Sequence, residues 1–414
     1  MRTGFRRSAL GTWLMLAGAA FALAPAPASA QQERLVGYQT WQVDPTFESW
    51  RFADALPEPL RGGSQPDTLF LRGASQWSMP LSALIPLGDR WTLDASAAYA
   101  MGSVHLARRD SLLGTDRLTL NGLTDVKLRA TGRLRGDNLL LTLGANLPTG
   151  TTRLDAEQLT ALGVLAAPAL RFQTPALGNG FGATTGLVAA RQLWGWAWAL
   201  GASYEMRGTY APIAALSAGA PSTDLDPGDA LHLSLGTDGL AGASHMSLSV
   251  AADLYGHDRL TIGTATGTRE VVGYTLGPMY SGQWQADLAL PGFRDAGAYL
   301  VDVYRTPFTR ADGSRPRGAY GNEMDAGVTG RLALRRTLAL VTGVDGQWQT
   351  GLQVDNTLAT AAIRSAGATL GLEYTHGGLT LRPFAHGRLG TVDTGGLRTS
   401  ATALDGGLTI GTSF

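Results

Sequence analysis

Two short runs of this sequence place a histidine two residues before a serine, at His232-Leu233-Ser234 and at His245-Met246-Ser247. A histidine that accepts the serine proton turns the hydroxyl into a nucleophile, provided that a third group orients the imidazole. In hydrolases that support the pair with Asn the run is His-x-Ser-Asn, whereas Leu235 and Leu248 follow the serines here. Residues two apart on a strand share a face, so plain alternation brings the same pair together. We therefore expect the chain not to be an enzyme.

The other candidates for acid-base or metal chemistry are isolated. His257-Asp258 falls in an expected loop and His376 in a Gly-rich hairpin, where a solvated turn accounts for both. The chain has no Cys, and its six His residues are scattered. Metal centres are built from clusters of such ligands. The sequence therefore predicts neither a metal site nor a cofactor.

A stronger regularity is that charged and polar residues recur at every second position. In 125–134, Lys127, Arg129 and Arg133 alternate with apolar residues, and 196–207 shows the same pattern. Successive side chains of a strand point to opposite faces. Each such segment is therefore predicted to be a strand with one polar and one apolar face.

The length of these segments favours a membrane. They run over about ten residues, the length that a tilted strand needs to cross a bilayer, whereas strands of soluble sandwiches are typically about 5–6 residues long. Hydrocarbon admits only helices and closed barrels, because unpaired backbone groups are too costly there. The expected fold class is all-β, a transmembrane antiparallel up-and-down β-barrel of about 14–16 strands.

With the apolar face toward lipid, the polar face becomes the lining of the barrel. The residues expected to line a pore are Lys127, Arg129, Arg133, Glu205, Arg207, Asp253, Asp345, Arg382 and Arg388. Two interpretations stay open: paired charges that stabilise the wall, or a wet lining that sets modest ion selectivity. The runs through Lys127 and through Arg382 would form ladders of cations. The aromatic residues near the expected strand ends fit an interfacial girdle.

Composition agrees with a barrel. Charged residues make up 16% of the chain, below the ~25% of typical soluble domains, yet no apolar run after residue 30 reaches the ~18 residues of a membrane helix. Residues 1–30 hold three of the 33 basic residues and no acid, so the remainder has a net charge of −3. This balance gives no case for nucleic-acid binding.

Residues 1–30 have the features of a secretory signal peptide. Arginines precede the apolar stretch Ala9–Leu23, and Ala28-Ser29-Ala30 forms a small-residue cleavage site before Gln31. The expected organisation is a signal peptide at 1–30, a strand or lumenal plug segment at 31–67 and a transmembrane barrel at 68–414. The expected location is the outer membrane of a Gram-negative bacterium.

The end of the chain carries a second signal. Leu404, Leu408, Ile410 and Phe414 share one face of the last expected strand. An apolar alternating strand that ends in an aromatic residue resembles the assembly signal of bacterial outer-membrane barrels. We therefore expect Phe414 to be this signal and the barrel-assembly machinery to be a partner during folding.

The strand count depends on the N-terminal segment. Barrels place short turns in the periplasm and long loops outside, and on this rule the expected strand 68–79 needs a partner before it. The aromatic segment 34–52 is the candidate, which gives about sixteen strands. If 31–67 is instead a plug, the count moves toward about fourteen. Segment 269–290 is long enough for two strands.

The longest expected connection is 148–177. A loop of this length can fold inward and narrow the pore. It contains Ala161–Leu170, which is too apolar for a fully solvated loop, so an additional strand there is the rival expectation.

One part of the chain resembles a known group. In Asp125–Gly150 an Asp opens an alternating strand, a tight turn follows at 135–137, and the segment ends in Leu147-Pro148-Thr149-Gly150. This arrangement resembles the outer-membrane transporter barrels associated with phenol meta-pathway degradation clusters. The resemblance implies a barrel and uptake of small molecules, apolar ones among them, and supplies no catalytic residues.

The expected function is that of an outer-membrane channel or transporter for passive passage of small solutes, with apolar or aromatic ones as candidates. The alternatives are a barrel enzyme that hydrolyses lipid or peptide, and a structural barrel. Expected partners are outer-membrane lipids and the solute, with no nucleic acid. The oligomeric state and the identity of the solute stay open.

Overall fold

The computed structural model describes most of the chain after the expected export signal. The described residues are 39–57, 69–108, 115–134, 138–213, 222–242, 244–263, 268–288, 290, 292–315, 321–350, 361–394 and 397–413. The signal peptide at 1–30, the turn at 135–137 and Phe414 lie outside these ranges, so the export and assembly signals stay predictions.

One closed antiparallel sheet forms the wall. It closes because β1 and β2 pair with β3 on one side and with β23 on the other. β5 and β6 likewise follow each other along β4. When β1 with β2 and β5 with β6 are each counted as one interrupted strand, the eighteen wall segments of the described chain form a barrel of sixteen strands. The expected all-β antiparallel barrel is confirmed. The wall segments are β1 (Thr40–Val43), β2 (Thr46–Pro57), β3 (Leu69–Leu87), β4 (Trp91–Arg108), β5 (Thr115–Leu123), β6 (Val126–Leu134), β7 (Leu139–Leu147), β8 (Gly182–Leu193), β9 (Trp196–Arg207), β12 (Ala230–Ala241), β13 (Ser244–Tyr255), β16 (Met279–Leu288), β17 (Phe293–Arg305), β19 (Gly321–Arg335), β20 (Leu338–Thr350), β21 (Ala362–His376), β22 (Leu379–Thr394) and β23 (Leu397–Ser413).

The outer face of the wall is apolar. Large apolar side chains are exposed at alternate positions around the barrel, among them Leu143, Leu187, Leu200, Leu235, Leu248, Val250, Val328, Val344, Leu370, Leu389 and Leu404. An apolar surface of this extent would be unfavourable in water, and contact with hydrocarbon accounts for it. Among the described residues no helix is long and apolar enough to cross a membrane.

Two segments left open by the sequence have definite places. Thr40–Pro57 lies in the wall between β23 and β3, as in the strand alternative and unlike a plug. Segment 269–290 divides in two: Arg269–Thr275 (β15) leaves the wall, and Met279–Leu288 (β16) is part of it.

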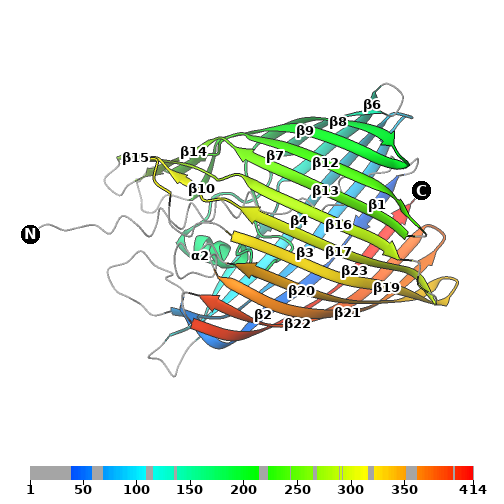
Figure 1. Ribbon diagram of the computed structural model, residues 1–414. Helices are drawn as coiled ribbons and strands as arrows, with labels where there is room; N and C mark the ends of the chain where they lie inside the picture. Colours follow the sequence, from blue (N-terminus) through cyan, green and yellow to red (C-terminus); the bar gives the residue numbers. More distant parts are fainter. Residues whose placement is uncertain are drawn as a thin grey trace, which may run out of the picture.

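The two ends of the barrel differ. At one end, the short-turn end, short turns such as 194–195 and 377–378 join the strands. Ser413 N, at the end of β23, donates to Gly378 O there. The other end, the long-loop end, carries α2, β10, β14 and β15 (Figure 1). Here strands within the long connections form a separate five-stranded sheet. Its strands are β10 (Tyr210–Ile213), β11 (Thr223–Asp226), β14 (His257–Gly263), β15 and β18 (Thr309–Arg310).

The connection between β7 and β8, residues 148–181, folds into the barrel and forms an inserted loop. It contains the helix α2 (Ala156–Leu165), whose N-terminus is capped by the carboxylate of Asp155 on Gln158 N at 2.8 Å. The expected inward loop is therefore present, and the rival expectation of an additional strand is wrong. Ala161–Leu170 is apolar because it packs in a buried cluster with inward residues of the wall.

The wall makes room for α2 with a glycine. Gly102 of β4 lies opposite Leu165, and a Cβ at Gly102 would collide with the Leu165 side chain. The neighbouring inward residues Ala100 and Val104 are buried against the same helix. Small inward residues on β4 therefore let the helix rest directly on the strand backbone.

The five-stranded sheet contains a buried carboxylate. Asp258 of β14 has 2% of its side chain exposed, accepts a hydrogen bond from Gly228 N at 2.7 Å, and lies 3.9 Å from the Arg207 guanidinium. Burial outweighs these two contacts and raises the pKa of Asp258 to about 6. Arg207, expected in the pore lining, lies at the rim and supports this sheet.

We expect the five-stranded sheet to be more stable in acid than at neutral pH. The folded pKa of Asp258 exceeds the ordinary value of 3.8, so the stability that its protonated form contributes is complete below pH 3.8 and lost as the pH rises through about 6. Amide protection of β14 and β15, measured by hydrogen exchange and corrected for intrinsic rates, should fall by up to about a hundredfold across this window, at about tenfold for each pKa unit. Asp258→Asn should abolish the dependence. Equal pH dependence in this variant would contradict the assignment.

Candidate functional site

The neck of the inserted loop is held by one carboxylate. Asp125, 4% exposed, accepts hydrogen bonds from Gly150 N at 2.8 Å, from Asn179 N at 2.6 Å and from Asn146 Nδ2 at 2.9 Å. Gly150 and Asn179 lie at opposite ends of the loop, so the carboxylate ties its two arms together. Asp125, between β5 and β6, and Gly150, at the end of the Leu-Pro-Thr-Gly run, are therefore two parts of one contact.

Beyond the neck, the loop is fixed to β2 and β3. Trp50 Nε1 donates to Leu170 O at 2.8 Å. Glu48 accepts from Gln173 N at 2.8 Å. The amide of Gln76 bonds both backbone groups of Thr174, at 2.7 and 2.9 Å. Backbone groups of an inserted loop lose water, and these inward side chains replace it.

The far side of the loop reaches the opposite wall. Arg171 binds Glu323 of β19 through Nη2 at 2.7 Å and Nε at 2.9 Å, and also pairs with Asp325. α2 packs against β5, and in the strand order seven barrel strands separate β5 from β19 in either direction. The inserted loop therefore crosses the lumen from one wall to the other.

Arg171 also has an unusual backbone. Its φ is +51°, a left-handed conformation that is unfavourable for a residue with a side chain. The guanidinium contacts on β19 hold it there, while Arg305 lies 3.7 Å from the second oxygen of Glu323. A residue held in such a conformation by long-range ion pairs marks the place where the loop is positioned most strictly.

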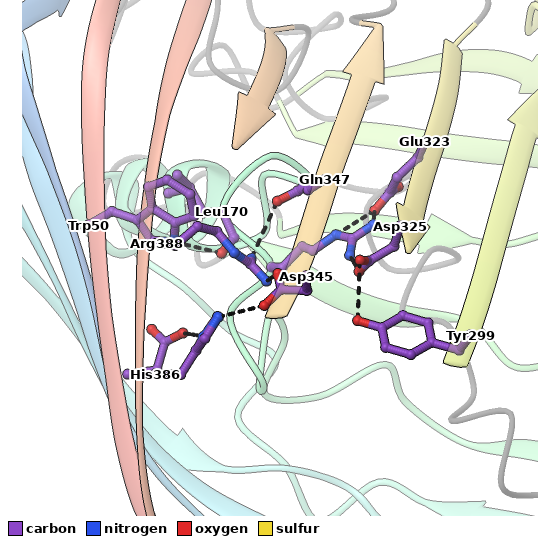
Figure 2. A network of polar contacts seen from close by, with 11 residues as sticks. Trp50, Leu170, Tyr299, Glu323, Asp325, Asp345, Gln347, His386 and Arg388 are labelled. Atoms are coloured by element: carbon purple, nitrogen blue, oxygen red, sulfur yellow. Dashed lines mark hydrogen bonds and ion pairs between the residues drawn. The ribbon is translucent and has the colours of Figure 1, made fainter. Parts of the chain in front are cut away.

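Next to this crossing point lies a network of charged residues from three strands (Figure 2). Arg388 donates to Asp345 at 2.7 Å, and His386 binds Asp345 at 2.8 Å and Asp405 at 2.9 Å. β21 runs between β20 and β22, and a Cβ at Gly367 would collide with the His386 ring. The glycine lets side chains of β20 and β22 meet across the intervening strand.

The same clasp of a histidine by two acids recurs along the inner wall. His232 lies 2.7 Å from Asp253 and 3.4 Å from Glu205, and His245 lies 2.8 Å from Asp238 and 3.5 Å from Asp287. Both ring nitrogens of each histidine face carboxylates, not Ser234 or Ser247. A histidine engaged on both nitrogens has no free nitrogen to accept a serine proton. This geometry favours structural ion pairs over the catalytic alternative.

The expected ladders of cations are interrupted by acids. Arg129 pairs with Asp94 at 3.1 Å, Arg382 with Glu373 at 2.5 Å, and Arg388 with Asp345. Lys127 and Arg133 share the inner face of β6 with Arg129. A charge at one wall position is thus balanced by a residue on another strand, so these strands do not form a continuous positive track.

The residues that hold the loop were not expected from the sequence. Arg171, Glu48, Glu323 and Asp325 are absent from the expected pore-lining set. The one available signal was the apolar stretch Ala161–Leu170, which indicates burial but not against which strands. In the described residues no group of three or more His, Cys, Asp or Glu side chains could hold a metal ion.

Comparison with known proteins gives only weak likenesses. No family model and no curated protein matches the chain. The in-vitro folded outer membrane protein OmpT of Vibrio cholerae aligns at 10% identity over 91% of this chain and 96% of its own, with a TM-score of 0.40. OprB of Pseudomonas putida, in its low-pH structure, aligns at 10% identity over 95% of this chain and 98% of its own, with a TM-score of 0.42. An outer membrane channel from Pseudomonas putida F1 aligns at 14% identity over 92% of this chain and 96% of its own, with a TM-score of 0.33.

Similarity at this level is no evidence for a shared activity, so a function has to be inferred from the residues of this chain. The narrower likeness to the phenol meta-pathway group stays a resemblance.

Asp125→Ala should open the neck of the inserted loop. Three hydrogen bonds to a buried carboxylate disappear, each worth about 1.5–3 kcal/mol, so we expect trypsin cleavage after Arg171 to accelerate at least tenfold, as a rough minimum from these energies. Limited proteolysis in detergent with mass spectrometry of the fragments measures it. Asp89→Ala, in a short turn at the other end, is the control, and equal cleavage rates in the two variants would refute the role of Asp125.

Proposed function

We propose that the protein is an outer-membrane channel through which small solutes diffuse past a constriction made by the inserted loop. A sixteen-stranded barrel encloses more space than its inward side chains fill, which leaves an aqueous channel. The carrying observation is the anchored crossing: a single loop spans the lumen, from its contacts with β2 and β3 to the ion pair between its Arg171 and Glu323 of β19.

The lining of the constriction carries both signs of charge. Glu48, Asp345 and Asp405 lie on one part of the wall, and Arg388 and His386 lie among them. Mixed charges favour solutes that travel with water and give weak preference for either ion sign. The apolar or aromatic solutes implied by the sequence resemblance are the second candidates, because the network beside the crossing point is charged.

The alternative of a barrel enzyme has weaker support. His232 and His245, the histidines of the two His-x-Ser runs, are each held by two carboxylates. A lipase or peptidase assay on the purified protein distinguishes the two functions, because turnover without conductance would exclude the channel.

Purified protein in planar bilayers should show discrete conductance steps, and Arg171→Ala should enlarge them. Without its ion pairs to Glu323 and Asp325 the loop loses its far anchor, and conductance should rise on the order of twofold because it follows the narrowest cross-section. Arg382→Ala, an inward arginine that pairs with Glu373 and not with the loop, is the matched control. Absence of conductance together with absence of solute uptake into liposomes would refute the proposal.

Ion selectivity should respond to the network beside the crossing. Arg388→Gln removes a positive charge and should move the reversal potential in a salt gradient toward cation preference. Asp345→Asn removes the opposite charge from the same pair and should move it toward anion preference. Shifts of the same sign in both variants would show that the pair does not face the permeating ions.

A further inference from the structure

The outer wall near the long-loop end carries a row of cations. In the register of four adjacent strands, Arg51 of β2 lies opposite Gly73 of β3, Gly73 opposite His105 of β4, and His105 opposite Arg117 of β5. Trp50 contacts the inserted loop inside the lumen, so Arg51 points outward. These three basic residues form the cation row.

His105 and Arg117 point outward for the same reason. Their neighbours Val104, Leu106 and Leu120 belong to the inward cluster around α2, and alternate residues face the other way. Arg51 and Arg117 are exposed and His105 is half-buried. The row is therefore on the side of the barrel that meets the surrounding membrane.

The two guanidinium charges of the cation row repel each other across His105. Adjacent strands lie about 4.7–4.9 Å apart, and the glycine between Arg51 and His105 contributes no side chain. His105 lies between Arg51 and Arg117 in the register and offers ring nitrogens for hydrogen bonds beside these two charges. No ion pair within the described ranges joins a carboxylate to any of the three. Such a row is stabilised by an external anion.

One step toward the short-turn end, the next row consists of hydroxyl residues. Ser49 lies opposite Ser75, Ser75 opposite Ser103, and Ser103 opposite Thr119. Ser75 and Ser103 are hydrogen-bonded at 3.0 Å, and Arg117 donates to Ser103 at 3.3 Å. These four form the hydroxyl row, in which Ser49 donates to Leu404 O at 3.2 Å and the exposed Thr119 offers a hydroxyl beside the cations.

The following row is apolar. Phe47 lies opposite Trp77 and Trp77 opposite Met101, and all three are exposed. Trp77 also meets Tyr99 edge-on, with ring centroids 6.1 Å apart. Aromatic side chains of this kind lie at the boundary between hydrocarbon and headgroups. Toward the long-loop end, three successive outward rows are therefore apolar, then hydroxyl-bearing, then cationic.

We propose that this face of β2 to β5 binds the phosphorylated headgroup of an outer-leaflet lipid. The lipid chains lie along the aromatic row, and the phosphate is held by Arg51, His105 and Arg117 with the hydroxyl row beneath it. Arginine forks match phosphate oxygens and keep their charge at the membrane surface. A soluble anion needs the cations but gains nothing from the aromatic row, which is why a lipid is the occupant.

The test compares two lipids on the purified full-length protein in detergent. Native mass spectrometry measures binding of diphosphoryl lipid A and of the same lipid with its phosphates removed. The Arg51→Gln/Arg117→Gln double variant should bind diphosphoryl lipid A about 30-fold more weakly, from about 1 kcal/mol for each cation near a membrane surface. Arg191→Gln, an exposed arginine near the opposite rim, is the matched control and should bind as the wild type does.

The heat-dependent shift in gel mobility of each variant, which reports a folded barrel, accompanies every measurement. Stronger binding of the phosphorylated lipid, lost in the double variant alone, supports the proposal. Equal binding of the two lipids, or an unchanged double variant that is folded, overturns it. Displacement of the lipid by millimolar sodium phosphate alone would assign the row to a free anion and would also overturn it.

Discussion

The structure depends on one constraint: inside hydrocarbon every backbone N–H and C=O must be paired within the protein. A sheet satisfies this only by closing, and β1 and β2 close it by pairing with β23 on one side and with β3 on the other. Closure forces the alternation seen in the sequence, because each wall residue must face lipid or lumen. An open sheet with the same strands would leave two edges unpaired.

A closed barrel in a membrane also lacks the buried apolar core that stabilises most soluble proteins. The apolar residues face lipid, so over much of its height the lumen is stabilised by polar contacts between neighbouring strands. Clasps such as Asp345–His386–Asp405 join strands that are not always adjacent, and a glycine at the crossing makes that possible. Within the described ranges, the buried apolar cluster that includes inward wall residues lies where α2 enters, because there a second element covers the inner face.

The sequence predicted what is local and repeated. Alternation has a period of two, so the inward positions of Arg129, Asp345 and Arg388 follow from their own segments. The route of the inserted loop does not, because its contacts join residues far apart: Arg171 and Glu323 are separated by 152 positions. The same limit explains why ladders of cations were expected. Arg129 and Arg388 were visible in their own strands, whereas the acids that pair with them lie on other strands.

Strand length links the inner and outer faces. β3 and β4 have 19 and 18 residues, while β7 has nine, and about 9–11 residues suffice to cross a bilayer. The extra length of β3 and β4 must extend beyond the hydrocarbon at the long-loop end. There the inner face can carry Ala100 and Val104 against α2, and the outer face of the same strands can carry His105 without entering hydrocarbon. One extension of the wall thus supports both the constriction inside and the cation row outside.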